Sequence, residues 1–196
     1  DLLALLDLER IEHNIFRGQN RDIGTGRIYG GQVLAQALTA AQRTVPEERP
    51  AHSLHGYFIL AGDLKVPVVY FVEALRDGGS FTTRRVTAIQ HGRAIFEMSA
   101  SFHVREEGFE HRATMPEVPD PESLPSELDV IRARAHELPE AVRATLTQER
   151  PLDFRLVDEE YPFDTAVRPP VRRYWVKTVS PLGDRLAEHQ AVLAYA

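Results

Sequence analysis

The sequence has 196 residues, of which 43% are hydrophobic and 27% are charged, and its formal net charge is -6. This length and composition indicate a globular protein with a sizeable core, and the acidic balance argues against a general nucleic-acid binder, which needs a basic surface. The absence of cysteine excludes disulfides, thiolate catalysis and cysteine-bound metals. No stretch approaches the ~20 apolar residues of a membrane span and no secretory signal is found, so we expect a cytoplasmic protein.

The first clear element is a helix in the N-terminal third. Residues 2–10 predict a short helix and residues 14–19 a strand. The clearest helix begins at Gly30-Gly31 and ends before Pro46, because its apolar residues recur at helical spacing. These apolar residues are Val33, Leu34, Ala37, Leu38, Ala41 and Val45. Much of the remaining helix surface is alanine, which other elements can approach closely, so we expect this helix at the centre of the fold.

Four strands follow the central helix. They are predicted over 52–60, 66–75, 81–90 and 94–104. The last strand alternates between apolar and polar residues, so one of its faces is buried. The apolar set is Ala94, Phe96, Met98, Ala100, Phe102 and Val104. We expect Met98 and Phe102 to pack under the helix against Leu34, Ala37 and Leu38.

Strand, helix and a four-stranded antiparallel meander make an α+β unit. One helix of small residues must then be covered by one curved antiparallel sheet that wraps around it. That arrangement is a hotdog fold.

The second half of the sequence begins with a Pro-rich connector. A helix is predicted over 127–146, strands over 151–157 and 171–179, and a helical start from 185 to 196.

The final helix resembles the central one, since Gln32–Ala37 aligns with Gln190–Tyr195. Such a short match can also arise by chance. A true repeat predicts a first hotdog domain over 1–107, a linker with a helix over 108–150, and an incomplete second hotdog over 151–196. The apolar face of that helix, with Val192, Leu193 and Tyr195, would then be exposed because its own meander is missing.

Few residues suggest catalytic chemistry. The sequence contains neither a G-x-S-x-G serine elbow nor a phosphate-binding glycine loop. Gly30, Gly31 and Gln32 open the central helix, whose free N–H groups suit a thioester carbonyl or an anion. The alternative is that these glycines only allow close packing.

Two other pairs of residues are candidate sites. His52 and His55 are three apart on a strand, which predicts opposite faces and therefore no shared metal. Arg84 and Arg85 are adjacent on a strand, so one of them should face solvent. That arginine is a candidate for binding the phosphates of a nucleotide-like ligand. A solvated arginine paired with a neighbouring acid is the alternative.

Several blocks of the sequence resemble the acyl-CoA thioesterase II family, in order and over nearly the whole chain. In the first half they are Phe16–Gln19, Tyr29–Val33, Val45–Arg49 and His52–Phe58. The remaining blocks are Leu75–Phe81, Thr83–Val86, Ala100–Phe102 and His189–Ala196. The Arg-Asp-Gly-Gly-Ser-Phe segment, followed by Arg-Arg-Val, is the most specific of them.

This resemblance implies a double hotdog that hydrolyses fatty acyl-CoA to free acid and CoA in fatty acid metabolism, with no metal or cofactor. Acyl-CoA is then the small-molecule partner, and homo-oligomers are expected. In this family an Asp, a Ser or Thr and a Gln of the second repeat activate water, and the acid follows the block at 189–196. Catalytic residues are therefore expected beyond Ala196. Within the sequence His52 falls where the family often has a histidine, and it is the one candidate here for a catalytic role.

Two other functions stay open at this point. One is a non-catalytic module that binds acyl-CoA without hydrolysing it. The other is a hotdog dehydratase or hydratase on 3-hydroxyacyl thioesters. That enzyme needs a catalytic His or acid near the central helix, and Gly30–Val33 contains neither. The sequence begins without Met and ends inside an apolar run, so we expect it to be a piece of a longer protein.

Overall fold

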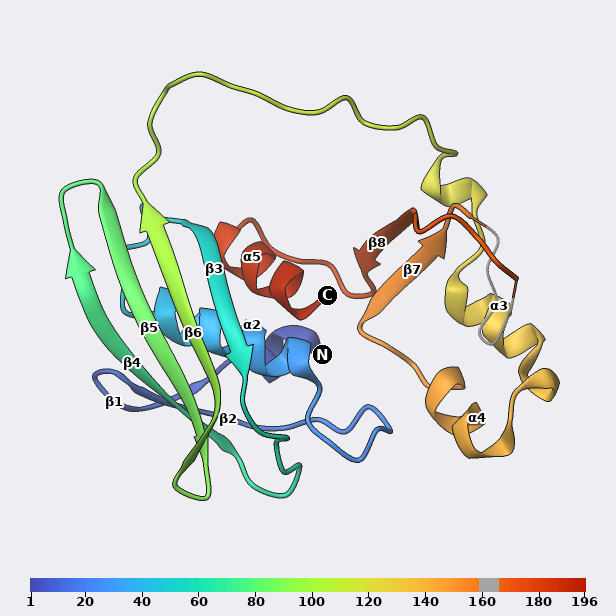
Figure 1. Ribbon diagram of the computed structural model, residues 1–196, viewed down its shortest axis with the longest axis horizontal. Helices are drawn as coiled ribbons and strands as arrows, with labels where there is room; N and C mark the ends of the chain where they lie inside the picture. The colour runs from blue at the N-terminus through green and yellow to red at the C-terminus, as the bar shows by residue number, and fades with distance from the viewer. Residues whose placement is uncertain (159–165) are drawn as a thin grey trace. The chain divides into compact units, whose positions relative to one another are not determined.

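The computed structural model describes residues 1–158 and 166–196, which belong to two compact units (Figure 1). The first unit comprises Asp1–Gly108 and Leu182–Ala196, and the second comprises Phe109–Pro181. The second unit is thus an insertion between two stretches of the first. No helix in the described ranges is long and apolar enough to cross a membrane.

The first unit contains a six-stranded antiparallel sheet in the order β1-β2-β4-β5-β6-β3. Its strands are β1 (Glu9–Glu12), β2 (Ile15–Gly18), β3 (Ala51–Phe58), β4 (Val68–Asp77), β5 (Phe81–Gln90) and β6 (Arg93–His103). The five predicted strands are confirmed as β2 to β6. The predicted four-stranded meander is wrong, because β3 pairs with β6 at the sheet edge and not with β4. This pairing sets Leu54 opposite Ala100 and Phe58 opposite Phe96.

The N-terminal helix is shorter than predicted. Helix α1 is Leu2–Leu6, with Leu2 and Leu6 buried one turn apart. The following residues form β1, which pairs with β2. All four residues of β1 are exposed, so the strand lacks the apolar alternation that would reveal it in the sequence.

The central helix is α2 (Gly30–Gln42), which lies along one face of the sheet (Figure 1). Its buried residues include Val33, Ala37 and Leu38, and they share one core cluster with Met98 and Phe102 of β6. Leu34 is partly buried against the same cluster. The predicted core under the helix is therefore confirmed, as is the buried face of the last strand from Phe96 to Phe102; Ile95, expected on the polar face, is buried as well.

A buried polar network fastens α2 to the start of the chain. The Tyr70 hydroxyl donates a 2.7 Å hydrogen bond to Gln36 Oε1, and Gln36 Nε2 donates to the carbonyls of Leu5 and Gln19. Burial raises the pKa of the Tyr70 phenol well above its ordinary value, so this phenol stays a donor. A Cβ at Gly18 would overlap the Gln36 amide, which explains the glycine in β2.

Helix α5 (Leu186–Tyr195) packs antiparallel against α2. The Gln42 side chain, at the end of α2, donates to the Ala187 carbonyl at 3.3 Å, whereas Tyr29 at the other end stacks edge-on against Tyr195. The predicted exposure of Val192 and Tyr195 is wrong, because α5 packs against α2 and both side chains are buried. Leu193 alone of the three is exposed, at 74%.

Gln190 anchors α5 to the edge strand. Its Nε2 donates a 2.6 Å hydrogen bond to the Ala51 carbonyl, and its Oε1 accepts from the Ala51 N–H at 3.3 Å. The same oxygen accepts from Gln42 Nε2. One amide side chain thus pairs with both backbone groups of Ala51, as a neighbouring strand would.

The second unit contains short helices and a two-stranded sheet. Its elements are η1 (Pro121–Ser123), α3 (Glu127–Ala133), η2 (Ala135–Glu137), α4 (Glu140–Thr147), β7 (Leu152–Leu156) and β8 (Tyr174–Thr178). Strands β7 and β8 pair antiparallel, which confirms both predicted strands. The single helix predicted over 127–146 is wrong, because Pro139 occupies the N-cap of α4 and begins a new helix. The domain boundaries predicted at 107 and 150 stay predictions.

Candidate active site

The N-terminal end of α2 offers unbonded backbone donors. Tyr29 is the N-cap in an extended conformation and contributes no side-chain cap. Its carbonyl accepts hydrogen bonds from the N–H groups of Gln32 and Val33. The N–H groups of Gly30 and Gly31 have no partner among the residues that the structure describes. Together with the positive end of the helix dipole, they can bind a carbonyl oxygen or an anion.

The two glycines also have a packing role. A Cβ at Gly31 would overlap the Tyr195 carbonyl and the Tyr29 ring, and a Cβ at Gly30 would lie 3.1 Å from the Phe58 ring. Close packing therefore requires glycine at 31 and favours it at 30. A role of the amides in binding stays compatible with this packing, because the N–H groups themselves have no partner in the described chain.

Gln32 is occupied by structural hydrogen bonds. It is 1% exposed, and its Nε2 donates to the Gln19 carbonyl and to Asn20 Oδ1, both at 3.2 Å. Its Oε1 accepts from the Arg21 N–H at 3.1 Å. The side chain thus holds residues 19–21 against the start of α2, and any direct contact with substrate stays a prediction.

Arg84 is directed into the first unit and Arg85 away from it. Arg84 is 4% exposed, and its guanidinium donates to the hydroxyl and carbonyl of Thr44 and to Asp77 Oδ1. A cation at the carbonyl end of α2 stabilises that end of the helix. This burial contradicts a role for Arg84 in binding a ligand from solvent. The sequence held the signal, since Arg84 has the same strand parity as the buried Val86 and Ala88.

Arg85 faces solvent. Its side chain is 49% exposed and lies 3.7 Å from Glu73 Oε2. This face of the sheet is opposite to α2. Arg85 is therefore not close to the N-terminal end of α2. Its binding of phosphate stays a prediction.

We expect Arg84→Met to lower the free energy of unfolding by about 1.5–3 kcal/mol, since it removes charge-assisted hydrogen bonds and leaves the Thr44 carbonyl without its donor. The matched variant Arg85→Met should change it by less than about 0.5 kcal/mol, because Arg85 is exposed. Urea unfolding followed by circular dichroism measures both. Equal losses in the two variants would contradict the inward assignment of Arg84.

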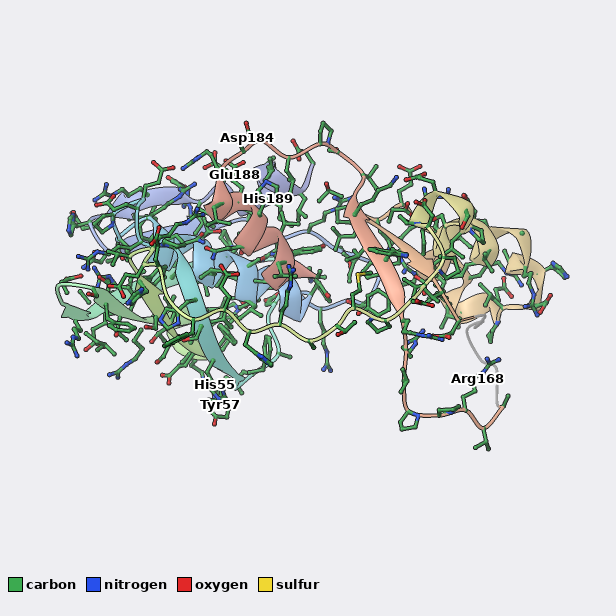
Figure 2. All side chains as sticks on the ribbon, turned by 90° about the horizontal axis from the view of Figure 1, so that it is seen from above. His55, Tyr57, Arg168, Asp184, Glu188 and His189 are labelled. Atoms are coloured by element: carbon green, nitrogen blue, oxygen red, sulfur yellow. The ribbon has the colours of Figure 1, made fainter. Side chains whose placement is uncertain are left out.

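His52 lies on the outer face of the sheet. Its Nε2 is 2.8 Å from Ser101 Oγ, and its ring lies 6.0 Å from that of His103. His55 pairs with Ser99 on the same face, and Figure 2 shows it projecting outward beside Tyr57. The predicted opposite faces are wrong, because an irregularity between residues 51 and 53 shifts the alternation.

The candidate catalytic His52 is therefore separated from the start of α2 by the sheet. In the described part of the chain no group of three or more His, Asp or Glu side chains is placed to hold a metal ion.

Tyr195 is a site neighbour that the sequence did not indicate. Its ring centroid is 5.1 Å from that of Tyr29, and its carbonyl lies against Gly31. Burial raises the pKa of the Tyr195 phenol, and Tyr29 raises it further, against an opposing effect of Arg21. The end of α5 thus lies beside the free amides of α2. Only the packing of two distant helices reveals this proximity.

Comparisons with known proteins identify the family of this chain. A family model described as the acyl-CoA thioesterase N-terminal domain matches residues 19–103. Acyl-CoA thioesterase 2 of Haemophilus influenzae is 41% identical over 195 residues, covering 100% of this chain and 68% of that protein. The chain belongs to the acyl-CoA thioesterase family. Acyl-coenzyme A thioesterase 8 of Mus musculus is another relative, 37% identical, of which the chain covers 63%. The family resemblance in the sequence is thus confirmed.

Solved structures of relatives confirm the fold of this thioesterase family member. The acyl-CoA thioesterase II TesB2 of Mycobacterium marinum is 37% identical, with a TM-score of 0.74, and the chain covers 67% of it. A hotdog-fold protein from Alicyclobacillus acidocaldarius, 22% identical, has a TM-score of 0.72 over 97% of the chain. The α+β hotdog prediction is confirmed, and the chain spans about two-thirds of the length of each of these two structures.

Proposed function

We propose that this family member hydrolyses acyl-CoA thioesters, and that the amides of Gly30 and Gly31 bind the thioester carbonyl. The observation that carries the proposal is the pair of unbonded N–H groups at the uncapped start of α2. Such donors stabilise the negative charge that develops on the carbonyl oxygen when water attacks. The water oxygen forms a bond to the acyl carbon, the C–S bond breaks, and the products are the fatty acid and the CoA thiol.

The water-activating group is the second part of the proposal. The resemblance predicts a carboxylate directly after Ala196. Tyr195 already lies beside Tyr29 and Gly31, so a carboxylate that follows it would be close to the amides of α2. Such a carboxylate removes the proton from the attacking water. His52 has no part in this scheme, because it lies on the other face of the sheet. Residence in the cytoplasm and assembly into homo-oligomers also stay predictions.

We expect Gly30→Pro to lower kcat by roughly 10²–10³, the cost of losing one carbonyl-binding donor. Proline removes the N–H yet suits the first position of a helix, and the extended Tyr29 before it is compatible. The matched variant Gly30→Ala keeps the N–H and adds a similar contact with Phe58, so it should retain most of the activity.

The measurement is the release of CoA from dodecanoyl-CoA, followed with a thiol reagent in a protein that carries the predicted carboxylate after Ala196. Residues 1–196 contain no cysteine to react with the reagent. Turnover should persist in a chelator. Equal kcat values for the proline and alanine variants would remove the amide of Gly30 from the mechanism. Binding of acyl-CoA without any CoA release would favour the non-catalytic module instead.

A further inference from the structure

A pocket of ≈ 390 Å³ opens at the N-terminal end of α2. Its wall consists of the first turn of α2, the segment before it, the end of β3, residues 59–62 and the start of β6. The apolar side chains that line it include Ile28, Val33, Phe58, Ile59, Leu60 and Ile95. This volume and this apolar lining are typical of small-molecule sites in proteins.

The end of β3 presents apolar side chains to solvent at this pocket. Phe58, Ile59 and Leu60 are consecutive, and they are 61%, 48% and 39% exposed. Consecutive exposed apolar residues beside a concavity indicate a surface that binds an apolar ligand or partner.

Arg27 provides the charge at the pocket. It is the one charged residue among those that line the pocket within the described chain. Its guanidinium is exposed and forms no hydrogen bond or ion pair with any described residue, and no carboxylate lines the pocket to oppose an anion. A guanidinium binds a carboxylate in a bidentate geometry. The pocket therefore combines an apolar lining with one unpaired cation.

We propose that this pocket binds a linear fatty acid, with the hydrocarbon chain against Ile59 and Phe58 and the carboxylate on Arg27. The choice of ligand rests on the proposed function, because a fatty acid is the product of acyl-CoA hydrolysis. Gly30 lies in the same wall, so the product would stay next to the amides that bound its carbonyl. The free acid carries the negative charge that the thioester lacks, and Arg27 thus favours the product over the substrate.

Isothermal titration of the purified protein with dodecanoate and with dodecanol tests this proposal. Dodecanoate should bind saturably. Arg27→Gln should weaken dodecanoate binding about fivefold, as expected for one exposed ion pair, and leave dodecanol unchanged. Arg93→Gln is the matched control, because Arg93 is also exposed without a described partner. It should change neither ligand.

Two further variants test the apolar part of the pocket. Ala61 lines the pocket and is exposed, so Ala61→Trp should fill the space without disturbing the core and weaken both ligands. Ile59→Gln should weaken both about fivefold through lost apolar contact, whereas Ile11→Gln, at a similarly exposed isoleucine of β1, should have no effect.

Three results would overturn the proposal. They are equal loss of dodecanoate and dodecanol binding in Arg27→Gln, undiminished binding in Ala61→Trp, and self-association that Ala61→Trp abolishes in a protein that binds no dodecanoate. The last result would assign the patch to a protein interface. Because titration needs no turnover, an inactive protein that still binds dodecanoate would overturn the proposed function alone.

Discussion

Phe102→Ala is expected to lower the free energy of unfolding of the first unit by about 3–5 kcal/mol. Phe102 is 0% exposed in β6, in the core cluster shared with Leu38 and Met98. Truncation removes the apolar contacts of a whole ring and leaves a cavity between the sheet and α2. The backbone cannot collapse into that cavity, since β6 is paired on both sides, to β5 and to β3.

Circular dichroism during urea unfolding measures this loss. Tryptophan fluorescence would not, because the single tryptophan, Trp175, lies in the second unit. Phe81→Ala is the matched control, since Phe81 is 45% exposed on the neighbouring strand, and it should cost less than about 1 kcal/mol. Similar losses of unfolding free energy in both variants would show that Phe102 contributes no more to the core between the sheet and α2 than an exposed phenylalanine does.

The second large effect is expected from Gly31→Val, which should cost about 3 kcal/mol and release α5 from α2. The new Cβ would overlap the Tyr195 carbonyl, which is backbone and moves only if α5 moves. Gly30→Val is the matched control on the same helix. There the Cβ meets only the ring of Phe58, a half-exposed side chain that can turn away.

Hydrogen exchange separates the two variants at Gly30 and Gly31. The amides of α5 should exchange faster in Gly31→Val and at the original rate in Gly30→Val, while the strands stay protected in both. Unchanged protection of α5 in Gly31→Val would mean that the close contact between the two helices is not required for docking.

The strands β2 to β6 and the central helix could be predicted because their apolar residues recur with the spacing of a strand or of a helix. In β6, Met98 and Phe102 alternate with polar residues, and in α2 the apolar residues recur at helical spacing. Strand β1 could not be found, since none of its residues is buried. The position of β3 at the sheet edge, next to β6, depends on pairing partners, which alternation along one strand does not specify.

The site could be predicted only in part, because contacts between distant segments are not specified by the local sequence. The glycines at the start of α2 are visible in the sequence, and so was the inward parity of Arg84. The environment of the glycines is not visible, because Tyr195 reaches Gly31 only when two helices far apart in the chain pack together. His52 was placed incorrectly relative to His55 because the irregularity at residues 51–53 has no distinct sequence signal. The pocket beside Arg27 is formed by segments from three parts of the chain.

The placement of Phe109–Pro181 between β6 and α5 affects the order in which the chain folds during synthesis. The sheet and α2 leave the ribosome first. Gln190, whose side chain pairs with the Ala51 backbone as a strand would, is synthesised only after the whole insertion. Until then the side of α2 that contacts α5 is uncovered in the nascent chain. Docking of α5 must also close a loop that contains the insertion, and the entropy of closure grows only logarithmically with loop length. Lengthening the insertion would therefore delay completion of the first unit far more than it would destabilise it.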